Sequence, residues 1–267
     1  MKKTLNIAHR GASSVAPENT LAAARRALEM GADMWEVDVG MTADSELIVL
    51  HDDTLDRTSN ATEMYPDRKP WLARDFTLDE LRRLDFGSWF MEKDPFGQVS
   101  AGKIAQHELA SYAGEPVLTL TDALQFTLRH DWYVNIEIKG LTVVEEVVHL
   151  VGKLGAADNV IISSFNSTCL KRVNRANPYV STGLLVDTPQ NDPVELLKEV
   201  KARAYHPRIH DLAPLDVAFL QAHGFEVRVW VVNDEEDMRT LISLGVDGIF
   251  TDFPQRLHCI QLNASHS

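Results

Sequence analysis

Cysteine is scarce in this chain, and its scarcity argues against a disulfide-stabilised fold. Only Cys169 and Cys259 occur among 267 residues, they lie far apart, and no CxxC pair is present. Such usage is typical of a reducing compartment, so we expect the protein to be cytoplasmic. The opening stretch MKKTLNIAHRG has two lysines but no apolar segment of signal-peptide type, which supports the same expectation.

Long apolar runs are also missing, and basic residues are fewer than acidic ones. No run approaches the ~18 apolar residues that a membrane-spanning helix requires, so we expect no stable membrane insertion. The 26 Lys and Arg residues face 39 Asp and Glu residues, giving a formal net charge of −13. That charge argues against nucleic acid or anionic membrane as a partner. An anionic substrate would therefore have to be attracted by local cations.

The sequence contains nine short apolar runs, and segments with a helical pattern separate most of them. From Tyr133 onward these runs begin at the spacing of a strand–helix unit, and alternating strands and helices predict a parallel sheet. The runs are Thr4–His9, Met34–Val39, Leu47–His51, Tyr133–Lys139, Val160–Phe165, Ser181–Val186, Ala204–His206, Glu226–Val232 and Asp247–Thr251.

One of the nine runs must belong to a hairpin. Between Val39 and Leu47 there is no room for the dozen or more residues that a parallel crossover requires. The third run therefore returns antiparallel after a turn near Thr42–Ser45, which sets Glu36 roughly opposite His51.

The remaining eight runs predict an α/β fold of the (β/α)8 TIM-barrel class, with the hairpin as an extension. We expect residues 1–267 to form a single barrel domain. Residues 52–118 fit no strand–helix unit, and we interpret them as a small insertion over the barrel mouth. Near the first helix, Asn19 suits an N-cap and Glu18 is placed to brace Arg10.

Carboxylates interrupt two of the predicted barrel strands. Glu36 and Asp38 are two positions apart and so share a face, while Glu137 lies on the next barrel strand. At the C-terminal strand ends, where such barrels hold their sites, the three would converge. Three converging carboxylates need a counter-charge, and an all-oxygen cluster favours Mg²⁺ or Ca²⁺ over zinc. We therefore predict a site for one divalent cation.

Two cations and two imidazoles fall at the same end of the predicted barrel. Arg10 suits bidentate phosphate binding, and Lys139 supplies a point charge. His9 and His51 titrate near neutral pH, as a general acid/base pair requires. The pattern predicts an oxyanion site of phosphate type.

Six segments carry a resemblance that runs from about Leu5 to Pro254. They are AHRGASSVAPENTLAA, WEVDVGMTADSELIVLHDD, NIEIK, IISSF, VWVVN and DGIFTDFP, in this order. Together they strongly resemble the glycerophosphodiester phosphodiesterases. The resemblance implies hydrolysis of small-molecule glycerophosphodiesters to sn-glycerol 3-phosphate and an alcohol, an activity of lipid and glycerol metabolism.

The resemblance also implies a role for each of these polar residues. The three carboxylates would bind the divalent cation, and the two histidines would be the catalytic acid/base pair. Arg10 and Lys139 would hold the phosphate, while Phe165 and Trp230 would line the alcohol pocket. We favour His9 as the acid of the first step.

Two other functions remain open at this point. A lysophospholipase D or phosphoinositol-type phosphodiesterase would keep the same machinery, but the former needs an apolar groove and the insertion is polar. A non-catalytic binding barrel would normally have lost a histidine or a carboxylate, and none is missing here. The head group, the physiological cation and the formation of a homodimer are not decided by the sequence.

Overall fold

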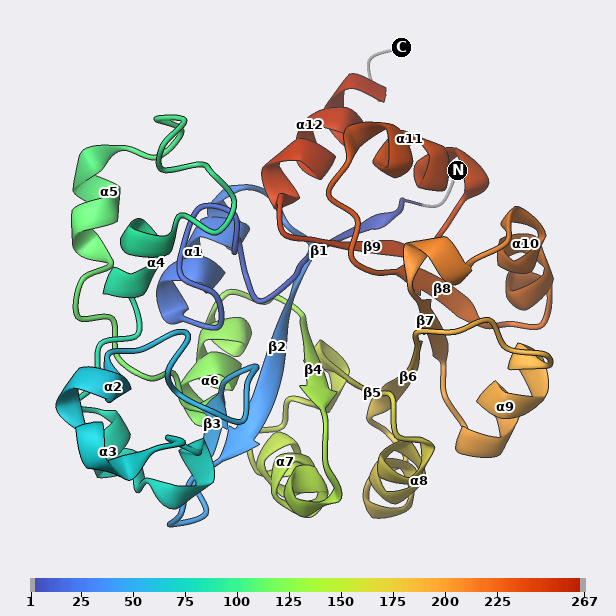
Figure 1. Cartoon of the computed structure of the whole chain (residues 1–267). Helices are drawn as coiled ribbons and strands as arrows, with labels where there is room; N and C mark the ends of the chain where they lie inside the picture. The colour runs from blue at the N-terminus through green and yellow to red at the C-terminus, as the bar shows by residue number, and fades with distance from the viewer. Residues whose placement is uncertain (1–2, 265–267) are drawn as a thin grey trace.

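Eight parallel strands close a ring in the computed structural model, which describes residues 3–264 (Figure 1). Each strand pairs with its neighbours, and β1 pairs with both β2 and β9, so the ring is closed. This confirms the predicted (β/α)8 barrel. The strands are β1 (Leu5–Ala8), β2 (Met34–Met41), β4 (Val134–Ile138), β5 (Val160–Ser164), β6 (Ser181–Val186), β7 (Ala204–Pro207), β8 (Glu226–Val229) and β9 (Gly248–Thr251).

The remaining strand, β3 (Leu47–Val49), forms the predicted antiparallel hairpin with β2. The tight turn between them needs a left-handed residue, and Ser45 provides it with a φ of 64°. Val39 pairs with Val49. Extending that register sets Glu36 opposite Asp52, one residue beyond the histidine that the sequence suggested.

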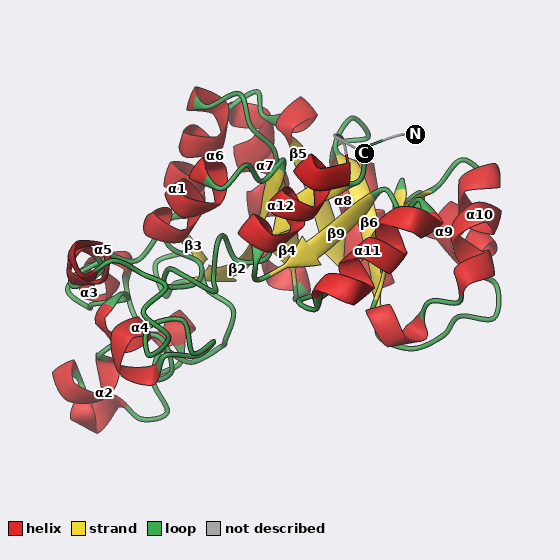
Figure 2. Cartoon of the chain, turned by 90° about the horizontal axis from the view of Figure 1, so that it is seen from above, coloured by secondary structure: helices red, strands yellow, loops and turns green. Residues whose placement is uncertain are grey.

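Helices surround the barrel on its outer side (Figures 1 and 2). They pack apolar faces on the strands, and in residues 3–264 none is long and apolar enough to cross a membrane. They are α1 (Leu21–Glu29), α6 (Leu120–Arg129), α7 (Val144–Lys153), α8 (Ser167–Ala176), α9 (Pro193–Val200), α10 (Pro214–Ala222), α11 (Glu235–Leu244) and α12 (Pro254–Ala264).

The N-cap of α1 corrects one expectation from the sequence. Thr20 caps the helix, because its side chain accepts a hydrogen bond from the Ala23 amide. Asn19, which we expected as the cap, has a φ of 58° and turns its side chain toward Asp38. Asn19 therefore forms a hydrogen bond at the barrel mouth and does not cap α1.

The barrel interior changes from apolar to polar along its length. Ile7, Met34, Ile161, Ala204 and Phe250 form a buried apolar cluster inside the ring. Side chains of a strand alternate between faces, so the next inward positions on the same strands carry polar groups instead. On these strands the inward side chains are therefore apolar toward the N-terminal end and polar toward the C-terminal end, where the barrel mouth lies.

Residues 52–118 form four short α-helices, of which the first two pack in an apolar cluster around Phe76 and the last two pack in the larger core cluster of the barrel. The helices are α2 (Ala61–Met64), α3 (Leu78–Leu81), α4 (Ser88–Lys93) and α5 (Gln106–Ser111). A capping box between Thr77 and Glu80 starts α3. In Figure 1 these helices lie to one side of the ring, beside β2, β3 and α1. Their interpretation as an insertion over the barrel mouth stays a prediction.

Candidate active site

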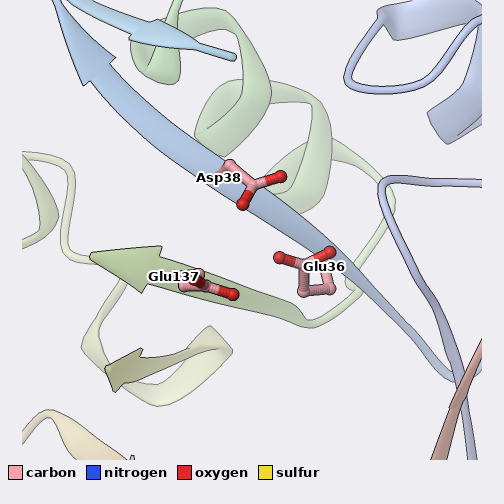
Figure 3. A group of neighbouring side chains, drawn as sticks. All are labelled: Glu36, Asp38 and Glu137. Carbon is pink, nitrogen blue, oxygen red and sulfur yellow. The ribbon is translucent and has the colours of Figure 1, made fainter. Parts of the chain in front are cut away.

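Three carboxylates from β2 and β4 converge on one point (Figure 3). Asp38 pairs in register with Glu137 on the neighbouring strand, and Glu36 lies two positions earlier on the same face as Asp38. One oxygen from each lies within 4.8 Å of the other two. Glu36 and Asp38 are almost completely buried. The convergence that strand alternation predicted is therefore present.

Burial and mutual repulsion set the charges of this cluster. Burial raises the pKa of Glu36 to about 8, with a further contribution from the charge of Asp38. Burial and the same charge raise the pKa of Glu137 to about 7. Among residues 3–264, Oε1 of Glu36 has no hydrogen-bond partner although it is buried. A divalent cation fits this all-oxygen set, because it would supply both the missing partner and the counter-charge.

Asp38 stays ionised because cations surround it. Burial opposes its ionisation, but Lys139 and Arg10 together hold the pKa of Asp38 well below its usual range. Lys139 Nζ lies 2.9 Å from Oδ1, and Arg10 Nε lies 3.4 Å from Oδ2. The Asn19 amide also donates to Oδ2 at 2.9 Å. Asn19 is thus a supporting residue whose role at the mouth we did not predict from the sequence.

His9, at the end of β1, is held by a carboxylate from β9. Its Nδ1 lies 2.8 Å from Oδ1 of Asp252. The same Oδ1 accepts a hydrogen bond from Ser13, and Oδ2 of Asp252 accepts one from Asn233. Burial lowers the pKa of His9, but the charge and hydrogen bond of Asp252, helped by Glu36, outweigh burial and raise it to about 9. This imidazole therefore carries a proton at neutral pH, with Nε2 directed to the side of Glu36.

His51 follows the hairpin and is held by its own neighbour. Its Nδ1 lies 2.5 Å from Oδ1 of Asp52. Burial lowers the pKa of His51, and the charges of Arg10 and Lys139 lower it further, against the opposing charge of Asp38. The pKa values of the two histidines are therefore shifted in opposite directions.

A cavity of about 260 Å³ opens between the two histidines. Phe165 and Trp230 form one wall, with ring centroids 5.5 Å apart and planes at 87°. Lys139 lines an adjacent cavity of about 290 Å³ that shares His51 with the first. Seven of the nine predicted site residues line the first cavity: His9, Arg10, Glu36, His51, Glu137, Phe165 and Trp230.

Besides Asn19, sequence reasoning missed two supporting residues at this mouth, Asp252 and Arg57. Asp252 follows the last strand, so its position at a strand end was a usable signal. Arg57 donates to Asp52 and to Glu18, which in turn accepts from Arg10 as expected. No periodic pattern surrounds Arg57 in the sequence, and its role is visible only in three dimensions.

Comparison with known proteins gives one consistent result. The model of the glycerophosphoryl diester phosphodiesterase family matches residues 9–256. A glycerophosphodiester phosphodiesterase of Caldanaerobacter subterraneus is 36% identical over 260 residues, which cover 96% of each chain. One from Bacillus subtilis is 32% identical, over 97% of this chain and 87% of the relative.

Two solved structures extend the likeness to three dimensions. A phosphodiesterase of Oleispira antarctica, in complex with the product sn-glycerol-3-phosphate, has a TM-score of 0.78 and 26% identity, covering 98% of this chain and 96% of its own. A glycerophosphodiester phosphodiesterase from Agrobacterium tumefaciens has a TM-score of 0.78 and 27% identity, covering 97% and 100%.

Proposed function

This chain is an enzyme of the glycerophosphoryl diester phosphodiesterase family, and from that premise we propose that it works with one divalent cation and a pair of histidines. The products would be sn-glycerol 3-phosphate and a free alcohol such as choline or ethanolamine. The observation that carries this proposal is the meeting of three carboxylates with two histidine–aspartate pairs around one cavity. We also propose that the enzyme is cytoplasmic.

The carboxylates of Glu36, Asp38 and Glu137 would hold the cation, Mg²⁺ or Ca²⁺. When bound, such an ion supplies positive charge to the phosphate and lowers the pKa of a nearby hydroxyl. Arg10 and Lys139 would hold the remaining phosphate oxygens. Nε of Arg10 suits this role, because it is buried and lacks a hydrogen-bond partner among residues 3–264.

One histidine would accept a proton and the other would donate one, because their pKa values are shifted in opposite directions. His51, which is neutral at neutral pH, takes the proton of the glycerol 2-hydroxyl. The hydroxyl oxygen then attacks phosphorus, and His9 gives its proton to the oxygen of the leaving alcohol. The resulting cyclic phosphate is opened by water with the roles reversed, which restores both histidines. Phe165 and Trp230 would line the side of the cavity from which the alcohol leaves.

The test is the release of sn-glycerol 3-phosphate from glycerophosphocholine by the purified enzyme. We expect no release after treatment with EDTA and recovery when Mg²⁺ or Ca²⁺ is added back. Lysophosphatidylcholine, assayed in parallel, should be the poorer substrate. Full activity in EDTA would contradict the role of the cation, and a preference for the lysophospholipid would contradict the substrate class.

A further inference from the structure

Arg57 links two carboxylates that support different parts of the proposed site. Its NH1 and NH2 groups donate to the two oxygens of Glu18, at 2.7 and 2.8 Å. Its Nε donates to Oδ2 of Asp52. A planar guanidinium can make these three bonds at once, whereas the ammonium of a lysine acts as a point charge.

The bond to Asp52 bears on the orientation of His51. Oδ1 of Asp52 binds Nδ1 of His51, so Arg57 occupies the oxygen that remains. Asp52 is about a quarter exposed, and a side chain at such a position rotates freely unless a partner holds it. By holding Oδ2, Arg57 orients the carboxylate whose Oδ1 holds the ring of His51, and so directs Nε2 of His51.

The bond to Glu18 bears on the charge of Arg10. Oε1 of Glu18 accepts from NH1 of Arg10 at 2.8 Å as well as from Arg57. The two guanidinium groups and the carboxylates of Glu18 and Asp52 sum to zero, and removing Arg57 would leave a net charge of −1. Without Arg57, Glu18 would neutralise Arg10 alone, and less positive charge would be left for a phosphate.

We propose that Arg57 is a positioning residue, which orients His51 through Asp52 and preserves the phosphate-binding charge of Arg10 through Glu18. The inference rests on the proposed function, because it assigns Arg57 a purpose in the same reaction. Arg57 itself lines neither cavity at the mouth and is not expected to touch the substrate.

The experiment compares kcat and KM for glycerophosphocholine in R57A, R57K and R68A, with the cation saturating and the melting temperature recorded. Arg68 is the matched control, because it is a partly exposed arginine of the same insertion that pairs with Glu80 at 2.6 Å, away from the site. We expect R57A to lower kcat by about 10- to 100-fold, as a misplaced catalytic group does, and to raise KM. R57K should recover little of kcat, and R68A should leave both constants unchanged.

A double-mutant cycle with Asp52→Ala shows whether Arg57 acts through Asp52. In the D52A background, adding R57A should lower kcat far less than it does in the wild type. If R57A does not fold, R57K carries the same cycle. A wild-type kcat in R57A or R57K, an undiminished effect in the D52A background, or an equal loss in R68A would overturn the inference. Failure of the proposed function would differ from all of these, since the wild type would then release no glycerol phosphate.

Discussion

The two histidine–aspartate pairs at the barrel mouth have the same contact between Nδ1 and a carboxylate but are supported differently. His9 and Asp252 come from adjacent barrel strands, and their side chains are 19% and 11% exposed. His51 and Asp52 are consecutive residues after a hairpin, with 35% and 26% exposed. The barrel itself fixes the first pair, whereas the second depends on a loop and on Arg57 from the insertion. A shared chemistry does not imply a shared structural origin.

The same comparison explains why the two imidazoles titrate differently. Around His9 the decisive opposing charges are carboxylates, and they raise its pKa to about 9 despite burial. Around His51 the charges of Arg10 and Lys139 act in the same direction as burial, and its pKa falls. From this difference we propose His9 as the acid of the first step and His51 as the base.

The largest expected effect is the loss of either histidine. His9→Ala and His51→Ala should each lower turnover of glycerophosphocholine by at least ~100-fold, because each removes a proton-transfer group. A glycerol phosphodiester with p-nitrophenol as the leaving alcohol needs little protonation of that alcohol. With it, the loss in H9A should shrink, while the loss in H51A should not. Initial rates with both substrates measure this.

Two outcomes of this pair of assays would contradict the proposed roles. Near-normal turnover in either variant would refute its catalytic role. Rescue of H51A and not of H9A by the activated leaving group would reverse the assignment of acid and base.

A smaller effect should follow from removing the charge of Asp252. Asp252 raises the pKa of His9, so Asp252→Asn should lower that pKa. The alkaline limb of the pH–rate profile, where His9 loses the proton that an acid must carry, should move to lower pH, with about a tenfold loss of kcat at neutral pH. Asp52→Asn should leave that limb in place. An unmoved limb in D252N would show that Asp252 does not set the charge of His9.

The smallest effect is expected at the aromatic wall. Phe165 is 46% exposed, and its ring rests on Trp230. Phe165→Ala should raise KM by a few-fold and leave kcat almost unchanged, as the loss of uniform binding does. Phe219→Ala is the control, because that ring is 50% exposed on α10, away from the cavity. Equal constants in F165A and the wild type would remove Phe165 from the binding site.

The strands and the carboxylate cluster could be predicted because both follow local rules. Apolar runs mark the barrel strands, and the run at Ser181–Val186 coincides with β6. The alternation of side chains along a strand places Glu36 and Asp38 on one face, and parallel pairing adds Glu137. The one distant contact, between the strands of Asp38 and Glu137, follows from the order of strands in the barrel.

The supporting residues could not be predicted, because they depend on distant contacts or on backbone turns. Asp252 is 243 positions from the histidine that it holds. Asparagine often caps helices, but the left-handed backbone of Asn19 turns its side chain toward Asp38. Arg57 lies in a loop whose path depends on the packing of the insertion. In each case tertiary structure decided among roles that the residue type alone allowed.

We propose that Glu36, Asp38 and Glu137 hold a single divalent cation, and calorimetric titration of Mg²⁺ and Ca²⁺ into the EDTA-treated protein measures this binding. We expect one site per chain in the wild type and in H9A. In Glu137→Gln the affinity should fall by at least about tenfold, because a ligand is lost. Binding by E137Q as tight as by the wild type would contradict the account.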